Sequence, residues 1–153
     1  MVTTRRGKAG KPVVSYNGYG AIETVAGKVD VLSADEHRSF LRDNGMSIAA
    51  SDDGYNTDWQ KEIMRDQGIS HSHNLSLIGG TEVTRYNASI NYLSNQGIVK
   101  TSNYDRLMAR IGVDQDAFEG RVRIGLALSG SMIKADHVSN TIFTYAARLL
   151  PDS

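Results

Sequence analysis

Two histidines separated by one residue could bind a metal ion. His71 and His73 fall in a stretch with strand character, so their side chains point to the same face. Imidazoles arranged in this way can ligate zinc or copper. The chain contains no cysteine, and a third ligand would have to come from a distant segment. The sequence therefore favours a polar strand entry over a metal site.

A second group of oxygen-bearing side chains surrounds Gly54. Asp52, Asp53, Asn56 and Asp58 lie within seven positions of one another. A calcium loop places its acidic ligands at alternate positions and ends on a bidentate glutamate. The spacing here does not fit an EF-hand, so the sequence favours a solvated turn and leaves calcium as an alternative.

A third arrangement is similar to a pair of catalytic carboxylates. Asp58 and Glu62 stand four residues apart beside Trp59, as the acid and base of a glycosidase could stand beside a sugar platform. Such spacing is common on exposed helices, and the first turn of a helix favours negative charge in any case. No Ser-His-Asp order or phosphate-cradling loop occurs, and Gly18 and Gly20 lack the third glycine of a dinucleotide fingerprint. We therefore predict no catalytic residues, no cofactor and no metal.

The composition limits the class of protein. In 153 residues, 17 lysines and arginines balance 17 aspartates and glutamates, so no overall basic field points to nucleic acid. A basic cluster near the start (Arg5, Arg6, Lys8 and Lys11) is interpreted as a solvated turn. No run of about 18 apolar residues could form a transmembrane helix, and the first residues lack the apolar segment of a secretory leader. The chain is therefore expected to be either cytoplasmic or an internal piece of a longer protein.

Alternation of apolar and polar residues predicts an all-β fold, an antiparallel up-and-down meander. The alternation is nearly free of error over 86–92, 107–114 and 122–129, and it is weaker in the first strand. A period of two indicates a strand with one apolar face. The five predicted strands span residues 12–26, 71–79, 84–94, 104–114 and 121–134.

Residues 27–70 form a long first connection with signals for two short helices. Ser33 and Glu36 make one capping box, and Thr57 and Gln60 make another. This connection is far longer than a hairpin loop, whereas the links at 80–83 and 116–120 are short. Because successive hairpin ends lie at opposite ends of the strands, long links gather at one end of the sheet and short turns at the other. Outer-membrane barrels show this asymmetry.

The faces of the strands favour a membrane barrel. The non-apolar faces are rich in Asn, Ser, Gly and Ala, and the strands have the length of about 9–11 residues that a membrane-spanning strand needs. Tyr86 and Phe118 fall at short-turn ends, and Tyr92 and Tyr104 at long-link ends, where aromatic girdles would lie. In a barrel, the polar wall that faces the lumen would comprise Asn87, Ser89, Asn91, Arg110, Asp114 and Arg123.

A soluble antiparallel sandwich also alternates, and it stays open as an alternative. Such a protein would be a soluble or surface module that binds carbohydrate or acts as an adhesin, with Trp59 and the tyrosines as ligand platforms. Five strands cannot close a barrel, because the smallest barrels have about eight. Alone, the sheet would expose two edges and an apolar face. We therefore predict a fragment of something larger.

With these residues placed, the chain resembles the SusC/RagA family of TonB-dependent outer-membrane transporters. Residues 2–12 resemble the junction between the plug and the barrel, and residues 14–19 resemble the first barrel strand. The other similar motifs follow in the family's order at 31–36, 57–60, 71–82, 86–92, 96–99, 104–107 and 126–131. The resemblance covers nearly the whole chain.

The resemblance implies a fold, a location and partners. Residues 1–11 would end the plug domain, 12–153 would begin a transmembrane barrel of about 22 strands, and 27–70 would be the first extracellular loop. The family imports nutrients such as glycans or oligopeptides across the outer membrane, together with a SusD-like surface lipoprotein. TonB drives the transport through a segment that lies outside this chain. Outer-membrane lipid would surround the barrel, and no nucleic acid is expected.

Overall fold

The computed structural model describes residues 10–47, 52–139 and 141–151. They form two compact units, a sheet unit and a helical unit, which are described separately. The sheet unit holds the described residues up to Ala21 together with Ile69–Gln96 and Asn103–Ala135, and the helical unit holds the others. Most of the segment 1–11, with Arg5, Arg6 and Lys8 of the basic cluster, lies outside the described residues.

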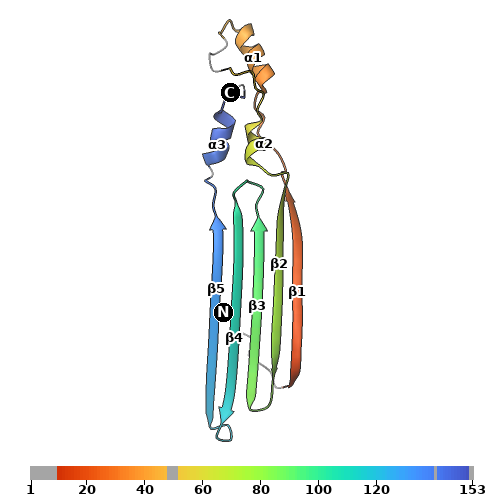
Figure 1. The fold of residues 1–153 in the computed structure, drawn as a ribbon, viewed down its shortest axis with the longest axis vertical. Coiled ribbons are helices and arrows are strands. Elements are labelled where there is room, and N and C mark those ends of the chain that lie inside the picture. Colours follow the sequence, from red (N-terminus) through yellow and green to blue (C-terminus); the bar gives the residue numbers. More distant parts are fainter. Residues whose placement is uncertain (1–9, 48–51, 140, 152–153) are drawn as a thin grey trace. The chain divides into compact units, whose positions relative to one another are not determined.

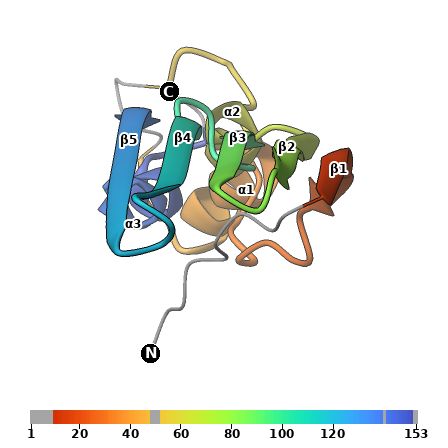
Figure 2. The same cartoon turned by 90° about the horizontal axis from the view of Figure 1, so that it is seen from below.

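The sheet is a five-stranded antiparallel meander in the order β1-β2-β3-β4-β5 (Figure 1). Seen from below, the strands follow one another in a single open row (Figure 2). Each strand has between 13 and 15 residues, well above the average of about 5–6 in soluble proteins. The all-β, up-and-down fold predicted from the alternation is confirmed. The strands are β1 (Gly10–Thr24), β2 (Gln67–Gly80), β3 (Thr84–Gln96), β4 (Asn103–Ala117) and β5 (Val122–Asp136).

The strands extend beyond the alternating stretches from which they were predicted. β1 begins at Gly10, and β2 begins at Gln67, so residues 67–70 belong to a strand and their assignment to the loop is wrong. Ser70 is paired with Asn95 of β3. The hydrogen bonds of a strand ladder come from the backbone alone, so pairing continues where the side-chain alternation fades.

The register gives the sheet one apolar and one polar face. Ile90 at the middle of β3 lies between Leu75 of β2 and Ala109 of β4. One residue earlier, Ser89 lies between Ser76 and Arg110 on the opposite face. The alternation read from the sequence therefore corresponds to two chemically different surfaces.

Tyrosines are placed on both faces. Tyr86 lies opposite Gly79 on the apolar face, where an added Cβ at Gly79 would be 2.7 Å from the tyrosine hydroxyl, so the ring covers the glycine. Tyr92 lies on the same face at the other end of the strand. Tyr104 is paired with Asn95 and belongs to the polar face, so the prediction that it joins an aromatic girdle is wrong.

The apolar face is exposed. Ile90 is 52% exposed and Ile111 is 54% exposed, although both lie mid-sheet. Among the described residues the buried apolar side chains are Ala34 and Ala146, and neither belongs to the sheet. A soluble sandwich would cover this face with a second sheet. The described part of the chain contains no such layer.

The helical unit begins with α1 (Ala34–Asp43). The predicted capping box is confirmed, since the Glu36 backbone N–H donates to Ser33 Oγ at 3.3 Å and the Ser33 N–H donates to Glu36 Oε2 at 2.9 Å. Gly45 follows the helix with a φ of +65°, a left-handed conformation that suits a helix stop. None of the described helices is long and apolar enough to cross a membrane.

The second helix, α2 (Trp59–Ile63), starts one residue later than the capping box predicted. Asp58 is the N-cap, and its Oδ1 accepts from the Lys61 N–H at 2.9 Å. The predicted cap at Thr57 with Gln60 is wrong because the Gln60 amide is bonded elsewhere, to the backbone of Val29. The partly apolar tail contains α3 (Thr141–Arg148), which packs against α2.

Replacement of Gly80 by alanine is expected to destabilise the β2–β3 hairpin. Gly80 has a φ of +153°, and an added Cβ would collide with the Thr84 carbonyl oxygen and lie 2.7 Å from Arg85 Cα. This backbone conformation costs any other residue about 1–3 kcal/mol before the collision is counted. Denaturant unfolding followed by far-UV circular dichroism measures the loss. Gly20→Ala is the matched control, because a Cβ at Gly20 meets nothing within 4 Å; equal stability of both variants would contradict the prediction.

Candidate functional site

The polar face of the sheet is the surface on which the predicted lumen residues lie. Ser89 pairs with Arg110, and Asn87 with Gly112. An added Cβ at Gly112 would collide with the Asn87 amide, so this side chain lies over the glycine. Asp114 Oδ1 is likewise 3.0 Å from the position of a Cβ at Gly125, which places it toward β5. Glycines on this face thus leave room for neighbouring polar side chains.

A shallow hollow of about 210 Å³ lies on this face. Three of the six predicted residues contribute to it, namely Ser89, Asn91 and Arg110, together with Asn74 and Met108. Neighbouring side chains interact along the same face, because Arg106 Nη2 donates to Asn91 Oδ1 at 3.4 Å. The hollow offers amide, hydroxyl and guanidinium groups, which can hydrogen-bond a polar surface but carry no nucleophile.

An ion triad occupies the turn end of the polar face. Asp116 accepts from Arg123 Nε at 2.6 Å and from Arg85 Nη2 at 2.9 Å. The Asp116 side chain is only 12% exposed, and Arg85 is 28% exposed. Arg123 is thus the predicted residue whose partner is clearest, while Arg85 and Asp116 were not identified from the sequence. The available signal was opposite charge on one face of the sheet, beside the two short turns.

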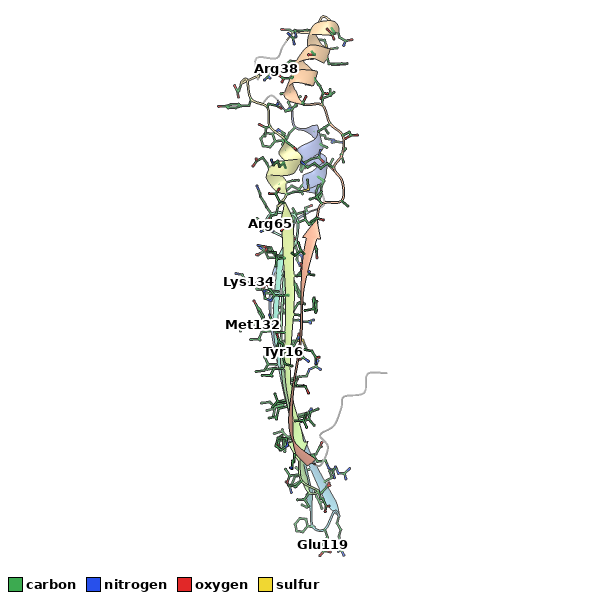
Figure 3. The ribbon with its side chains drawn as sticks, turned by 90° about the vertical axis from the view of Figure 1, so that its right-hand side faces the viewer. Tyr16, Arg38, Arg65, Glu119, Met132 and Lys134 are labelled. Atoms are coloured by element: carbon green, nitrogen blue, oxygen red, sulfur yellow. The ribbon has the colours of Figure 1, made fainter. Side chains whose placement is uncertain are left out.

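The two histidines lie on the apolar face, in the same alternating set as Leu75. Their ring centroids are 5.2 Å apart. Tyr16 of β1 reaches His73, with 2.6 Å between the tyrosine hydroxyl and Nδ1. Figure 3 shows the sheet edge-on, with Tyr16 labelled among the side chains that line it. The sequence placed both histidines on one face correctly but did not anticipate the tyrosine.

The acidic residues of the long link are bound to separate partners. Asp52 receives two hydrogen bonds from Arg38, at 2.8 Å from Nε and 2.7 Å from Nη2. Asp58 pairs with Lys28 at 2.7 Å, and Asn56 Oδ1 accepts from a backbone N–H of α1. The described residues contain no group of three or more histidine or acidic side chains placed to hold a metal ion. The structure therefore gives the calcium alternative no support.

The two carboxylates beside Trp59 also have partners within the chain. Asp58 caps α2, and the hydrogen bond from Lys28 lowers the pKa of its carboxyl, with the Lys61 N–H adding to the effect. Glu62 lies 3.8 Å from Lys100. Trp59 Nε1 donates to the Leu150 carbonyl at 3.0 Å, so the indole anchors the chain after α3. These contacts favour a structural role over a glycosidase site.

The helical unit also has an open hollow of about 740 Å³. Its walls come from residues 28–33, the start of α2 and the segment 146–151. Three hydrogen bonds fix these walls. The Thr57 N–H donates to the Pro151 carbonyl at 2.8 Å, the Val29 N–H donates to Gln60 Oε1, and Gln60 Nε2 donates to the Val29 carbonyl. Gln60 is only 5% exposed, so a buried amide joins the segments.

Arg65 ties the link between β3 and β4 to the chain after α2. Its Nη1 donates to the carbonyls of Gly97 and Val99 at 2.8 and 3.0 Å. The backbone of the same segment adds a bridge between Met64 and Val99 and a bond from the Lys100 N–H to the Ile63 carbonyl. The two links are therefore held together within the helical unit.

Known proteins share this sequence and fold. No family model matches the chain. It is 36% identical over 128 residues to the TonB-dependent receptor SusC of Bacteroides thetaiotaomicron, which covers 82% of the chain and 13% of that protein. It is 34% identical over 142 residues to TonB-dependent receptor P3 of Formosa agariphila, which covers 91% of the chain and 14% of the relative. The structure of the RagAB peptide transporter is similar to this fold, with a TM-score of 0.68 and 19% sequence identity. The match covers 87% of this chain and 19% of the transporter chain.

These matches define first a class of protein. The open meander corresponds to a segment of the barrel of a TonB-dependent transporter. More particularly, the chain belongs to the SusC/RagA-like TonB-dependent transporters, as its resemblance to the family predicted. The chain spans about 13–14% of the length of the curated relatives named here. Their names are those of receptors, which agrees with the prediction that the chain is not an enzyme.

The Asp52–Arg38 pair predicts that the region around α1 loosens in acid. Hydrogen bonds from Arg38 and from the Gly54 N–H lower the pKa of Asp52 from 3.8 to about 2. Because the folded pKa is depressed, the stabilisation is complete above about pH 4 and is lost as the pH falls through about 2. Hydrogen exchange of α1, corrected for intrinsic rates, should show protection that disappears over this window.

Asp52→Asn should remove most of that protection already above pH 4 and abolish its pH dependence. Asp53→Asn is the control, because it changes the adjacent exposed carboxylate by the same chemistry. An identical pH profile for Asp52→Asn and the unsubstituted chain would show that the pair does not hold this region.

Proposed function

We propose that this chain is part of the wall and first outer loop of a transporter that imports nutrients across the outer membrane. The observation that carries the proposal is the exposed apolar face of a long-stranded, single-layer sheet. An apolar face of this width in water is an aggregation hazard. The same face in a membrane barrel contacts lipid, and the alternate residues contact the lumen.

The extent of the apolar band supports this proposal. On β3 the band is bounded by Thr84, opposite Gln115, and by Ser94, which lies between His71 and Asp105. The ten residue-to-residue steps from 84 to 94 rise about 33 Å along the strand. At the tilt of about 40° typical of such barrels, they span about 25 Å, which equals the height of the apolar band of an outer-membrane barrel.

The polar face then lines the lumen. Asn87, Ser89 and Asn91 follow one another along β3, and Arg110, Asp114 and Arg123 extend the same surface over β4 and β5. In this proposal the six residues solvate the lumen and hydrogen-bond a plug domain that ends within residues 1–11. Residues 12–153 then begin the barrel, together with Gly10 and Lys11, which already belong to β1. The connection 27–70, apart from the strand residues 67–70, is the first extracellular loop.

The partners and cargo follow from the family and are proposed for the whole protein. A SusD-like surface lipoprotein would capture the substrate with the transporter, and TonB would energise import through a segment outside this chain. Glycans or oligopeptides are the proposed substrates. The similar protein of known structure is a peptide transporter, which supports the oligopeptide class.

Fractionation of source cells tests the location and the size of the protein. An antibody raised to residues 27–70 should detect an outer-membrane band far above 16.7 kDa that shifts on heating. A band near 16.7 kDa in the soluble fraction would contradict the proposal and favour a soluble binding module. Uptake of labelled oligosaccharides and oligopeptides by cells with and without the gene then distinguishes the two classes of cargo.

Two neighbouring substitutions test which face contacts lipid. Ile90→Arg, at the middle of β3, should destabilise the barrel by about 2–4 kcal/mol, the cost of an arginine at the bilayer midplane. Ser89→Arg changes the adjacent residue on the polar face and should have a small effect. The effect of each substitution is measured by the yield of heat-modifiable protein in the outer membrane and by unfolding of that protein in denaturant. Equal tolerance of the two arginines would contradict the assignment of the faces.

A further inference from the structure

We propose that His71 and His73 form a site for a divalent transition-metal ion, with Cu²⁺ bound most tightly and Zn²⁺ next. The two residues are neighbours on the same face of β2, and their rings are tilted by 54° with centroids 5.2 Å apart. The proposal concerns only the sheet unit and is independent of what the transporter carries.

The separation of the rings fits bidentate binding. Two nitrogens at about 2.0–2.1 Å from one ion, in tetrahedral geometry, lie about 3.3 Å apart. Each imidazole nitrogen is offset from the centre of its own ring, so centroids a little over 5 Å apart allow both nitrogens to reach the same ion. The two imidazoles supply two ligands, and water fills the remaining positions.

The hydrogen bonds of the two histidines leave one nitrogen of each ring available to bind a metal ion. The buried Nδ1 of His71 has no hydrogen-bond partner within the described chain, so this ring keeps a nitrogen that no protein atom uses. His73 Nδ1 lies 2.6 Å from the Tyr16 hydroxyl. When Nδ1–H donates to the tyrosine oxygen, Nε2 of His73 carries the free lone pair. This is the outer-sphere arrangement that commonly orients a metal-binding histidine.

Access to the pair comes from the polar end of the apolar face. His71 lies opposite Ser94, which lies opposite Asp105, so this row of the face is hydrophilic. His71 is half-buried and His73 is exposed. Tyr92 contacts His71 from β3, with 5.7 Å between ring centroids, and limits its rotation. Ordered imidazoles reduce the entropy lost when the ion binds.

The choice of ion follows from the ligands. Neutral imidazole suits copper and zinc, whereas calcium and magnesium require oxygen ligands. For a site with nitrogen ligands and flexible remaining positions, the affinity order places Cu²⁺ above Zn²⁺. Binding requires both imidazoles to be neutral, so it should be lost when the solution is acidified.

Titration of the intact protein in detergent with Cu²⁺ tests the proposal. We expect saturable binding of one ion and an electron paramagnetic resonance spectrum with hyperfine coupling to two nitrogens. His73→Gln should remove the coupling to one nitrogen and weaken binding by more than about tenfold, and Tyr16→Phe should weaken it by about tenfold through loss of the orienting bond. His137→Gln, in the helical unit, is the control and should leave binding unchanged. Binding that is equal in His73→Gln and the unsubstituted protein would overturn the proposal, as would the absence of saturable binding.

A second measurement avoids substitutions that could impair folding. Diethyl pyrocarbonate modifies accessible imidazoles, and mass spectrometry locates the modified residues. In the unsubstituted protein, Zn²⁺ should slow the modification of His71 and His73 but not that of His137. Equal rates with and without Zn²⁺ at all three positions would also contradict the site.

Discussion

The structure depends on an apolar face that the described residues do not cover. The strand ladder satisfies the backbone of β2, β3 and β4, but it leaves Ile90 and Ile111 half exposed. The stabilisation that a globular domain obtains from a buried core is missing from the sheet unit. Something outside the described residues must therefore remove this face from water. Membership of the SusC/RagA-like transporters identifies lipid as the natural candidate, because their barrels stand in a bilayer.

The helical unit is held together by polar side-chain hydrogen bonds more than by apolar packing. Its buried apolar side chains among the described residues are two alanines, Ala34 and Ala146, so packing contributes little. Long polar side chains instead reach backbone groups of distant segments. Arg38 binds Asp52 and a carbonyl, Gln60 pairs with Val29, and Arg65 binds two carbonyls of the 97–102 link. Such bonds have directional requirements, so they fix the course of irregular segments more specifically than apolar contacts would.

The two kinds of connection between strands differ for a related reason. At the short turns the backbone itself is constrained: Gly80 has a positive φ, and Phe118 and Glu119 take left-handed conformations that are unusual for residues other than glycine. The ion triad of Arg85, Asp116 and Arg123 joins three strands there. The long connections instead contain helices and form a unit with its own hydrogen bonds. The short turns are therefore tight and charged, whereas the long connections belong to the helical unit.

The sequence alone determined the strands and their faces, because a period of two states directly which residues share a surface. It also determined the first capping box, since Ser33 and Glu36 interact within one helical turn. The family was recognisable from ordered motifs. Tertiary structure alone decided the partners of Asp52, Asp58, Gln60 and Asp116, because each bonds to a residue distant in sequence or on another strand. The N-cap of α2 is Asp58 and not Thr57 for the same reason. The Gln60 side chain does not complete the local capping box, because it hydrogen-bonds the Val29 backbone, 31 residues away.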